Sequence, residues 1–414
     1  MNADVIRAAP ATDPSGFEPL LPRQEHVPQL LELANELQER CWRLSGKSVP
    51  GVRQRLTRLL RGMNSYYTNK IEGQHTLPAD IEDALNNHYS ADPKRARGQR
   101  LAIAHLRTEE WAESQLDTQS ADGWKATFST EFVCRLHEHL YQQLPEEDRV
   151  TETGAPICEG LLREQNVKVG QHVAPDYKAM PRFLERWKTF YTRLPRGEQA
   201  LLGVACAHHR LAWIHPFMDG NGRVARLQSH LALTAMGLTG GYWSPMRGLA
   251  RRQEDYYARL VDADEPRRGD FDGRGALTEE GLVGFAKFFL EVCIDQVEFM
   301  DKMLNLHEFK DRLEALLSFE IHAGKLPDLR MDVIRPLHYI ILNGPIERGA
   351  FKAMTGLKTR TAERALKALL DYKLLLSDTP KGEVYFGVPQ DSLRFLFPNL
   401  WPEAEAAIER RRGE

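Results

Sequence analysis

The sequence is poor in cysteine, and its few cysteines follow no paired spacing. Five occur among 414 residues, at Cys41, Cys134, Cys158, Cys206 and Cys293. An odd number of widely separated cysteines excludes a disulfide framework and a cysteine-based metal cluster. Such cysteines are typical of reduced thiols, so we expect a cytoplasmic protein.

Long apolar runs and an excess of either charge are also missing. No stretch reaches the roughly 20 successive apolar residues of a membrane-spanning helix, so we expect no membrane partner. The N-terminus lacks the basic-then-apolar pattern of a signal peptide. The 55 basic and 58 acidic residues give a net charge of −3, so any attraction to nucleic acid has to be local.

Chemically useful side chains are concentrated in residues 215–226, which read HPFMDGNGRVAR. Apolar spacing predicts one helix before this stretch, over 199–214, and another after it that ends near Gly237. The second helix therefore begins at the glycines. Free backbone N–H groups and the positive end of the helix dipole gather there, which favours a bound phosphate.

The residue types in this stretch suggest a division of labour. The neutral imidazole of His215 suits removal of a proton from an attacking hydroxyl. Asp219 offers one oxygen ligand to Mg²⁺, which takes its other ligands from water and phosphates. Backbone N–H groups between small residues and two guanidiniums on one helix face make a phosphate-binding set, namely Gly220, Asn221, Gly222, Arg223 and Arg226. The reaction favoured is transfer of a nucleotidyl group to a hydroxyl.

Three other interpretations of the stretch explain less. The spacing Gly220-x-Gly222-x-x-Ala225 imitates a dinucleotide fingerprint, but a helix and not a strand precedes it. A plain glycine turn with solvated arginines leaves the density of chemical groups unexplained. A zinc site would need ligands whose spacing matches no standard helical pair, namely His208, His209, His215 and Asp219.

The stretch resembles the signature of the Fic domain family, H-x-F-x-[D/E]-G-N-G-R-x-x-R, and it fills every fixed position. The resemblance covers roughly residues 65–303. It implies a mainly α fold, with a Fic-type helical bundle and a β-hairpin flap. It also implies adenylylation, in which AMP moves from ATP, with Mg²⁺, to a Ser, Thr or Tyr hydroxyl of a target protein or of the chain itself.

An earlier helix end carries Thr68, Glu72 and Gly73. On the residues alone this is a capped surface helix, with Gly73 as its C-terminal cap. It resembles the inhibitory motif [S/T]-x-x-x-E-[G/N] of Fic proteins. The resemblance implies that Glu72 pairs with Arg226 and withholds that arginine from the γ-phosphate. The same glutamate would alternatively position a water for removal of AMP.

Two further segments resemble parts of a Fic site. Alternating valines between glycines predict a short hairpin over 160–172. An ordinary surface hairpin is the alternative to a flap that pairs with the target's backbone, and the flap residues would be Arg163, Val167, Val169, Gly170 and His172. Tyr257 and Asp264 would border the adenine, although Asp264 stands where the family has asparagine and weakens the expected base preference.

The last third predicts a separate small domain over 330–400. Three helices, over 333–342, 346–354 and 359–370, precede a hairpin with its turn at 378–382, and this order resembles a winged helix. Basic side chains on its third helix and hairpin tip suit DNA contact, namely Lys358, Arg360, Arg364, Lys367 and Lys381. Protein docking or support of a homodimer is the open alternative.

The other domain boundaries follow from the resemblance together with proline-rich and charged stretches. We predict a flexible arm (1–24), an N-terminal helical region with the inhibitory helix (25–120), a Fic core (121–304), a connecting helix and loop (305–329) and a charged tail (401–414).

Two classes of function then compete. The first is an autoinhibited protein adenylyltransferase with an unidentified target protein. The second is a nucleotide-sensing, DNA-binding transcriptional regulator without transferase activity. The intact His215 favours the enzyme, because a sensor needs no proton acceptor.

Overall fold

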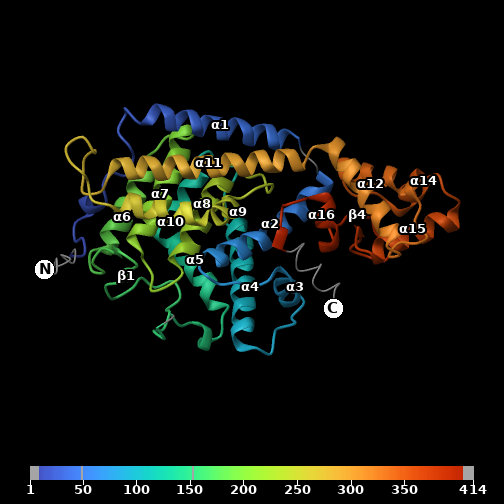
Figure 1. The fold of residues 1–414 in the computed structure, drawn as a ribbon, viewed down its shortest axis with the longest axis horizontal. Coiled ribbons are helices and arrows are strands. Elements are labelled where there is room, and N and C mark those ends of the chain that lie inside the picture. The colour runs from blue at the N-terminus through green and yellow to red at the C-terminus, as the bar shows by residue number, and fades with distance from the viewer. Residues whose placement is uncertain (1–8, 48–49, 152, 404–414) are drawn as a thin grey trace.

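The structure is a computed structural model that describes residues 9–47, 50–151 and 153–403, and the described chain is mainly helical (Figure 1). The mainly α prediction is therefore confirmed. The helices of its body are α1 (Val27–Gly46), α2 (Pro50–Ile71), α3 (Pro78–Leu85), α4 (Pro93–Ser114), α5 (Thr130–Gln142), α6 (Met180–Tyr191), α7 (Glu198–Ile214), α8 (Asn221–Ala235), α9 (Pro245–Arg251), α10 (Gln253–Asp264) and α11 (Glu279–Met303).

Local sequence explains where several of these helices begin. The side chains of Asp92, Ser129 and Thr278 each accept a hydrogen bond from a backbone N–H in the first turn of α4, α5 and α11. Such caps satisfy donors that have no partner inside the helix.

The core is centred on α7 and α8, which carry the 215–226 stretch between them. Nearly every residue of both helices is buried, as expected of central helices in a bundle. Helices α1 and α11 lie side by side along one side of this pair, and α6 packs on α7 (Figure 1). The stretch between α7 and α8 is therefore held by a close-packed interior.

The predicted flexible arm over 1–24 is wrong for the part that the structure describes. Phe17, at the end of the 3₁₀ turn η1 (Pro14–Phe17), packs edge-on against Phe183, with ring centroids 5.2 Å apart. The hydroxyl of Tyr191 donates to the carbonyl of Leu20 at 2.8 Å. The prolines of this segment suggested a loose arm, although its apolar side chains pack into the core. Residues 1–8 lie outside the described residues.

The predicted hairpin is present and small. Strand β1 (Lys168–Val169) pairs antiparallel with β2 (His172–Val173), and Val169 faces His172 across the pair. Gly170 adopts a φ of 59° in the turn, a conformation that favours glycine.

The C-terminal part has the predicted order of three helices and a hairpin, although its assignment as a winged helix stays a prediction. Its elements are α12 (Leu306–His322), α13 (Ile334–Asn343), α14 (Arg348–Thr355), α15 (Thr359–Asp371), β3 (Leu375–Leu376), β4 (Tyr385–Phe386) and α16 (Leu393–Leu396). It is not isolated, because α2 packs on both α13 and β4. The predicted charged tail begins with the buried Trp401, whose ring lies 5.8 Å from that of Tyr66, and its residues 404–414 lie outside the described chain.

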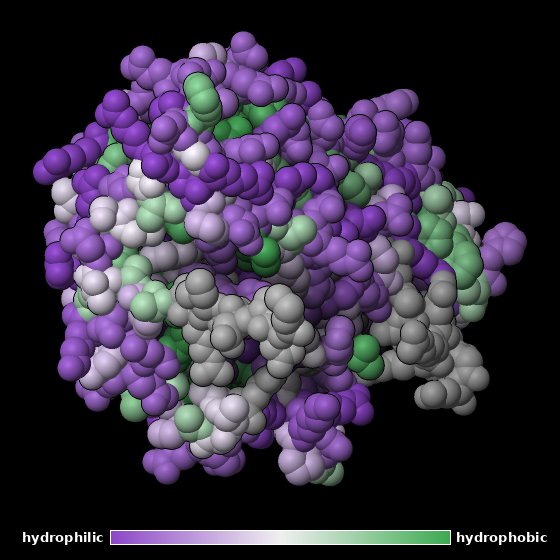
Figure 2. Space-filling view, turned by 60° about the vertical axis from the view of Figure 1, so that its left-hand side comes forward, coloured by the Kyte–Doolittle hydropathy of each residue, from purple (hydrophilic) through white to green (hydrophobic). Residues whose placement is uncertain are grey.

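Hydrophilic side chains cover most of the face shown in Figure 2, and apolar ones form small scattered groups. No helix within the described ranges is both long enough and apolar enough to cross a membrane.

Candidate active site

The loop between α7 and α8 has a fixed backbone. His215 ends α7 in the left-handed conformation, with a φ of 50°, which is uncommon for a residue other than glycine. The side-chain amide of Asn221 accepts from the N–H of Phe217 at 2.9 Å and donates to its carbonyl at 2.8 Å. The Asn221 side chain therefore stabilises the loop. Only the backbone of Asn221 is available to contact a ligand.

The end of α2 lies against the start of α8. The Glu72 carboxylate pairs with the guanidinium of Arg226, which is 1% exposed. The Arg226 Nε donates to the hydroxyl of Thr68 at 2.7 Å, and one of its terminal nitrogens donates to the Thr68 carbonyl at 3.1 Å. The structure thus brings together the three residues that the resemblance linked.

Gly222 and Gly73 allow this approach for different reasons. A Cβ at position 222 would overlap the Glu72 carboxylate, so only glycine leaves room for it. Gly73 adopts a φ of 74° just beyond the end of α2, and the N–H of Gln74 donates back to the carbonyl of Asn69 at 2.9 Å. The turn at Gly73 directs Glu72 to the N-terminus of α8.

The Glu72 carboxylate is negatively charged in this position. Burial acts to raise its pKa, but the neighbouring Arg226 and Arg223 outweigh burial and hold the pKa below its ordinary value. A carboxylate at the N-terminus of α8 also benefits from the helix dipole. Glu72 therefore occupies the place that the sequence predicted for an anion.

Arg223 points to the same end of α8 but is incompletely paired. Its guanidinium is buried and donates to the hydroxyl of Tyr141 at 2.8 Å, while its Nε has no hydrogen-bond partner among the described residues. A buried donor without an acceptor is unfavourable. An anionic ligand is the natural acceptor for it.

Two site residues on α5, His137 and Tyr141, were missed by sequence reasoning. The His137 ring stacks on Phe217 at 4.0 Å, and burial lowers its pKa to about 3. Its Nδ1 accepts from the N–H of Gly160 at 2.9 Å, so its Nε2 carries the proton that bonds the Asp219 carbonyl at 3.2 Å. Their spacing of four residues, which places both on one side of the helix, was the available signal.

His215 and Asp219 have the properties that their predicted roles require. Burial, with help from the neighbouring His172 and Arg163, lowers the pKa of His215 to about 4. Its imidazole is therefore neutral at physiological pH and can accept a proton. Asp219 is partly exposed, and a single carboxylate beside a phosphate site suits Mg²⁺.

The flap is fixed at its base by Arg163. This buried guanidinium donates to the carbonyl of His215 at 2.8 Å, and to those of Gln165 and Pro175 at 2.7 and 2.6 Å. In contrast, Val169 on β1 is 49% exposed. Arg163 therefore locks the hairpin segment to the His215 loop, while the outer strand is accessible.

We expect Arg163→Met to destabilise the protein by about 3 kcal/mol, because the stem is retained while three carbonyls lose their donor. Urea unfolding measures this change. The matched control is Arg182→Met, since that side chain is 64% exposed and should alter stability little. Equal stability of the two variants would contradict the locking role.

Asp264 contacts two histidines in the structure, and its predicted place beside the adenine stays a prediction. Its carboxylate lies 3.1 Å from Nε2 of His209 and 3.4 Å from Nδ1 of His172, so it ties the flap to α7 and α10. Tyr257 is 42% exposed, and its hydroxyl donates to the carbonyl of Ile71 at the end of α2. The sequence could not show either contact, because both join segments far apart in the chain. An adenine contact by Tyr257 stays a prediction.

The alternative zinc site at residues 208, 209, 215 and 219 is not assembled. His208 bonds the hydroxyls of Ser229 and Tyr256 at 2.6 and 2.8 Å through its two ring nitrogens. Within the described ranges, the group of side chains with metal-ligating geometry lies elsewhere, at Glu109, Glu113 and His230.

The predicted DNA contacts lie apart from this site. All five basic residues are exposed, and α15, which carries three of them, lies at the end of the molecule opposite the flap (Figure 1). DNA contact by this surface stays a prediction.

Behind the arginines, His105 of α4 is fully buried without a hydrogen bond to any described residue. Burial, aided by Arg226 and Arg223, lowers its pKa from 6.5 to about 3. Between pH 6.5 and about pH 3, His105 binds a proton in the unfolded chain but not in the folded one. The free energy of unfolding therefore decreases as the pH falls below about 6.5.

We therefore expect His105→Leu to be stabilised relative to wild type by about 2 kcal/mol more at pH 5 than at pH 7. Urea unfolding at the two pH values measures the difference. The control is the same change at the exposed His307, which is solvated in both states. A gain that does not depend on pH would contradict the assignment.

Comparison with known proteins agrees with this geometry. The Fic/DOC family model matches residues 127–233, which include the whole 215–226 stretch. A Protein adenylyltransferase Fic from Nematostella vectensis is 23% identical over 274 residues, 63% of this chain and 59% of that protein. A protein of the same name from Drosophila ananassae is 33% identical over 113 residues, 27% of this chain and 21% of that protein. The chain thus spans about three fifths of the first relative and one fifth of the second.

A solved structure shares the fold over most of the chain. The crystal structure of a Fic family protein from Desulfovibrio desulfuricans G20 aligns with a TM-score of 0.52 and 17% identity, covering 90% of this chain and 99% of that one. The chain is therefore similar to Fic/DOC proteins through residues 127–233, and it shares the fold of the Desulfovibrio protein.

Proposed function

We propose that the chain is a protein adenylyltransferase, in which Glu72 restrains the transfer of AMP from ATP to a protein hydroxyl. The observation that carries the proposal is a carboxylate paired with Arg226 at the N-terminus of α8, one loop away from a neutral His215. The names of the two relatives support the same activity.

In the proposed complex the nucleotide phosphates lie at the N-terminus of α8. Backbone N–H groups at Gly222 and its neighbours face them, and the unpaired Nε of Arg223 gains an acceptor. Arg226 binds the terminal phosphate once Glu72 releases it. Glu72 and the γ-phosphate thus compete for one guanidinium.

His215 acts as the general base. Its neutral imidazole takes the proton of a Ser, Thr or Tyr hydroxyl as that oxygen attacks the α-phosphorus. The new oxygen–phosphorus bond replaces the bond to the oxygen that bridges the α- and β-phosphates, and pyrophosphate leaves. AMP stays on the target as an ester. Mg²⁺, held by Asp219, would neutralise charge on the departing phosphates.

The flap presents the target. Its outer strand β1 is exposed, so an extended target segment can add to it as a further strand. Arg163 fixes the distance from this strand to the His215 loop. Because main-chain pairing carries little sequence information, target choice depends on other surfaces.

The proposal is tested with ATP labelled at either the α- or the γ-phosphate. The purified chain, with its own hydroxyls and cell extract as acceptors, should become labelled from the α-position alone. Label from the γ-position would indicate phosphoryl transfer instead. Absence of α-label from wild type and from a Glu72→Gly variant would reject adenylylation and leave the nucleotide-sensing regulator.

A further inference from the structure

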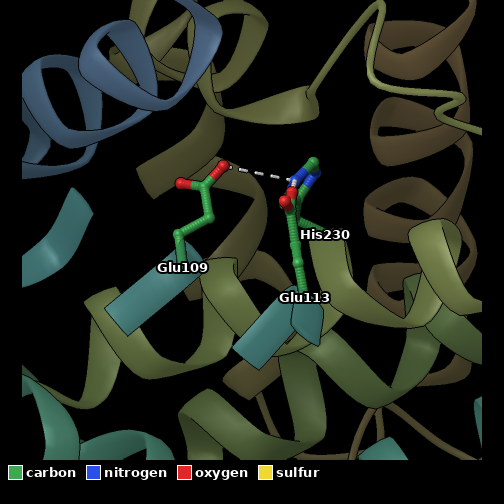
Figure 3. Close-up of side chains that lie close together, drawn as sticks. All are labelled: Glu109, Glu113 and His230. Atoms are coloured by element: carbon green, nitrogen blue, oxygen red, sulfur yellow. Dashed lines mark ion pairs between the residues drawn. The ribbon is translucent and has the colours of Figure 1, made fainter. Parts of the chain in front are cut away.

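A second constellation of ligating side chains lies outside the site described above. Glu109 and Glu113 come from successive turns of α4, and His230 comes from α8, one turn beyond Arg226. Figure 3 shows the three side chains converging, with a dashed line between the Glu109 carboxylate and the His230 ring. Their ligand atoms all lie within 4.8 Å of one another.

The separations suit a bound metal. Nε2 of His230 lies 3.5 Å from a Glu109 oxygen and 3.7 Å from a Glu113 oxygen. Ligands at bond lengths of about 2.1 Å in tetrahedral geometry are about 3.4 Å apart, so a small inward shift closes the site. Residues four apart on one helix face, such as Glu109 and Glu113, are well placed to bind one ion.

The Glu109 carboxylate is the observation that points to a ligand. It is 1% exposed, and its Oε2 has no hydrogen-bond partner among the described residues. Its other oxygen, Oε1, faces Nε2 of His230 at 3.5 Å and accepts from the amide of Asn64 at 2.8 Å. The nearby guanidinium of Arg61 is committed to Glu113, at 2.5 Å. A buried carboxylate that has no guanidinium or ammonium partner favours a cation beside the imidazole that it faces.

The cluster also has room for further ligands and a route to solvent. It lines a cavity of about 410 Å³, whose walls include Thr234 and Thr239 and whose rim includes the exposed Arg53 and Thr118. Waters in this cavity can complete the coordination of an ion held by three protein ligands.

We propose that Glu109, Glu113 and His230 form a binding site for a divalent transition-metal ion of the Zn²⁺ class. Mixed imidazole and carboxylate ligands suit such ions, whereas Mg²⁺ and Ca²⁺ prefer oxygen ligands alone. Arg61 and Asn64 tie the same carboxylates to α2, whose far end carries Thr68 and leads into Glu72. A bound ion would thus hold α2 against α4 and α8. This metal-site proposal does not depend on the proposed AMP transfer.

The test is calorimetric titration of the full chain, stripped with a chelator, with Zn²⁺ alone, and absorption spectroscopy with Co²⁺. We expect one ion per chain, no competition by millimolar Mg²⁺, and a higher unfolding temperature when Zn²⁺ is present. Because a direct ligand is lost, His230→Gln and Glu113→Gln should each weaken binding about 100-fold or more.

Two controls locate the ion. Glu110→Gln removes a charge from the same helix at an exposed position, and it should bind Zn²⁺ like wild type. His215→Ala should also bind normally, and loss of binding there would assign the ion to the active site and overturn the proposal. Absence of binding, or undiminished binding in both ligand variants, would overturn it as well. Glu113 is 19% exposed, so Glu113→Gln provides a folded test if His230→Gln fails to fold.

Discussion

The Glu72→Gly variant is expected to transfer AMP about 10- to 100-fold faster than wild type. The pair between Glu72 and the buried Arg226 is worth about 1–3 kcal/mol, and the terminal phosphate has to replace it before ATP binds in line for attack. The measurement is the initial rate of protein labelling from α-labelled ATP at saturating nucleotide. Autolabelling and labelling of proteins in cell extract should both increase.

Matched variants separate loss of charge from loss of bulk at position 72. Glu72→Gln keeps the size of the side chain but removes the charge that pairs with Arg226, so an intermediate rate is expected. Adding Arg226→Ala to Glu72→Gly should abolish the gain, because the released guanidinium is then missing. A Glu72→Gly variant no faster than wild type would contradict autoinhibition.

Thr68 would make the proposed restraint by Glu72 reversible. When Glu72 leaves, Arg226 still donates to the hydroxyl and carbonyl of Thr68, so its guanidinium stays in place. Tyr257 holds the end of α2 through the carbonyl of Ile71, independently of Glu72. Release therefore needs only a local movement after the last turn of α2, and not unfolding of that helix.

The sequence predicted those parts of the site that depend on local spacing. The helices around residues 215–226 and the hairpin follow from apolar periodicity and glycine placement, and the pairing of Glu72 with Arg226 followed from the resemblance. The contacts of His137, Tyr141 and Asp264 were not predictable, because each depends on how distant helices pack.

Two features show that local sequence patterns do not predict tertiary packing. They are the buried segment around Phe17 and the side-chain cluster around His230. Four prolines before residue 23 suggested a loose arm, yet the apolar side chains between them complete the core. Glu109 and Glu113 fit an ordinary helix face until α8 brings His230 against them. Local patterns predict elements, whereas burial and pairing of polar groups depend on the assembled fold.

Replacing His215 by asparagine in the Glu72→Gly background is expected to slow AMP transfer by about 10²- to 10⁴-fold, the usual contribution of a general base. Asparagine is a better test than alanine, because His215 has a φ of 50° and asparagine is among the residues that tolerate this conformation. The backbone of the loop, and with it the phosphate site on α8, should therefore be preserved.

Single-turnover labelling and nucleotide affinity, measured on the same two proteins, distinguish loss of the base from loss of the site. ATP affinity should be unchanged while the transfer rate falls. In the Glu72→Gly parent, the rate should also persist well below pH 6.5, because burial keeps the pKa of His215 near 4 and its imidazole neutral. Equal transfer rates with and without His215 would remove the imidazole from the chemistry, and weaker ATP binding would indicate that the loop itself had moved.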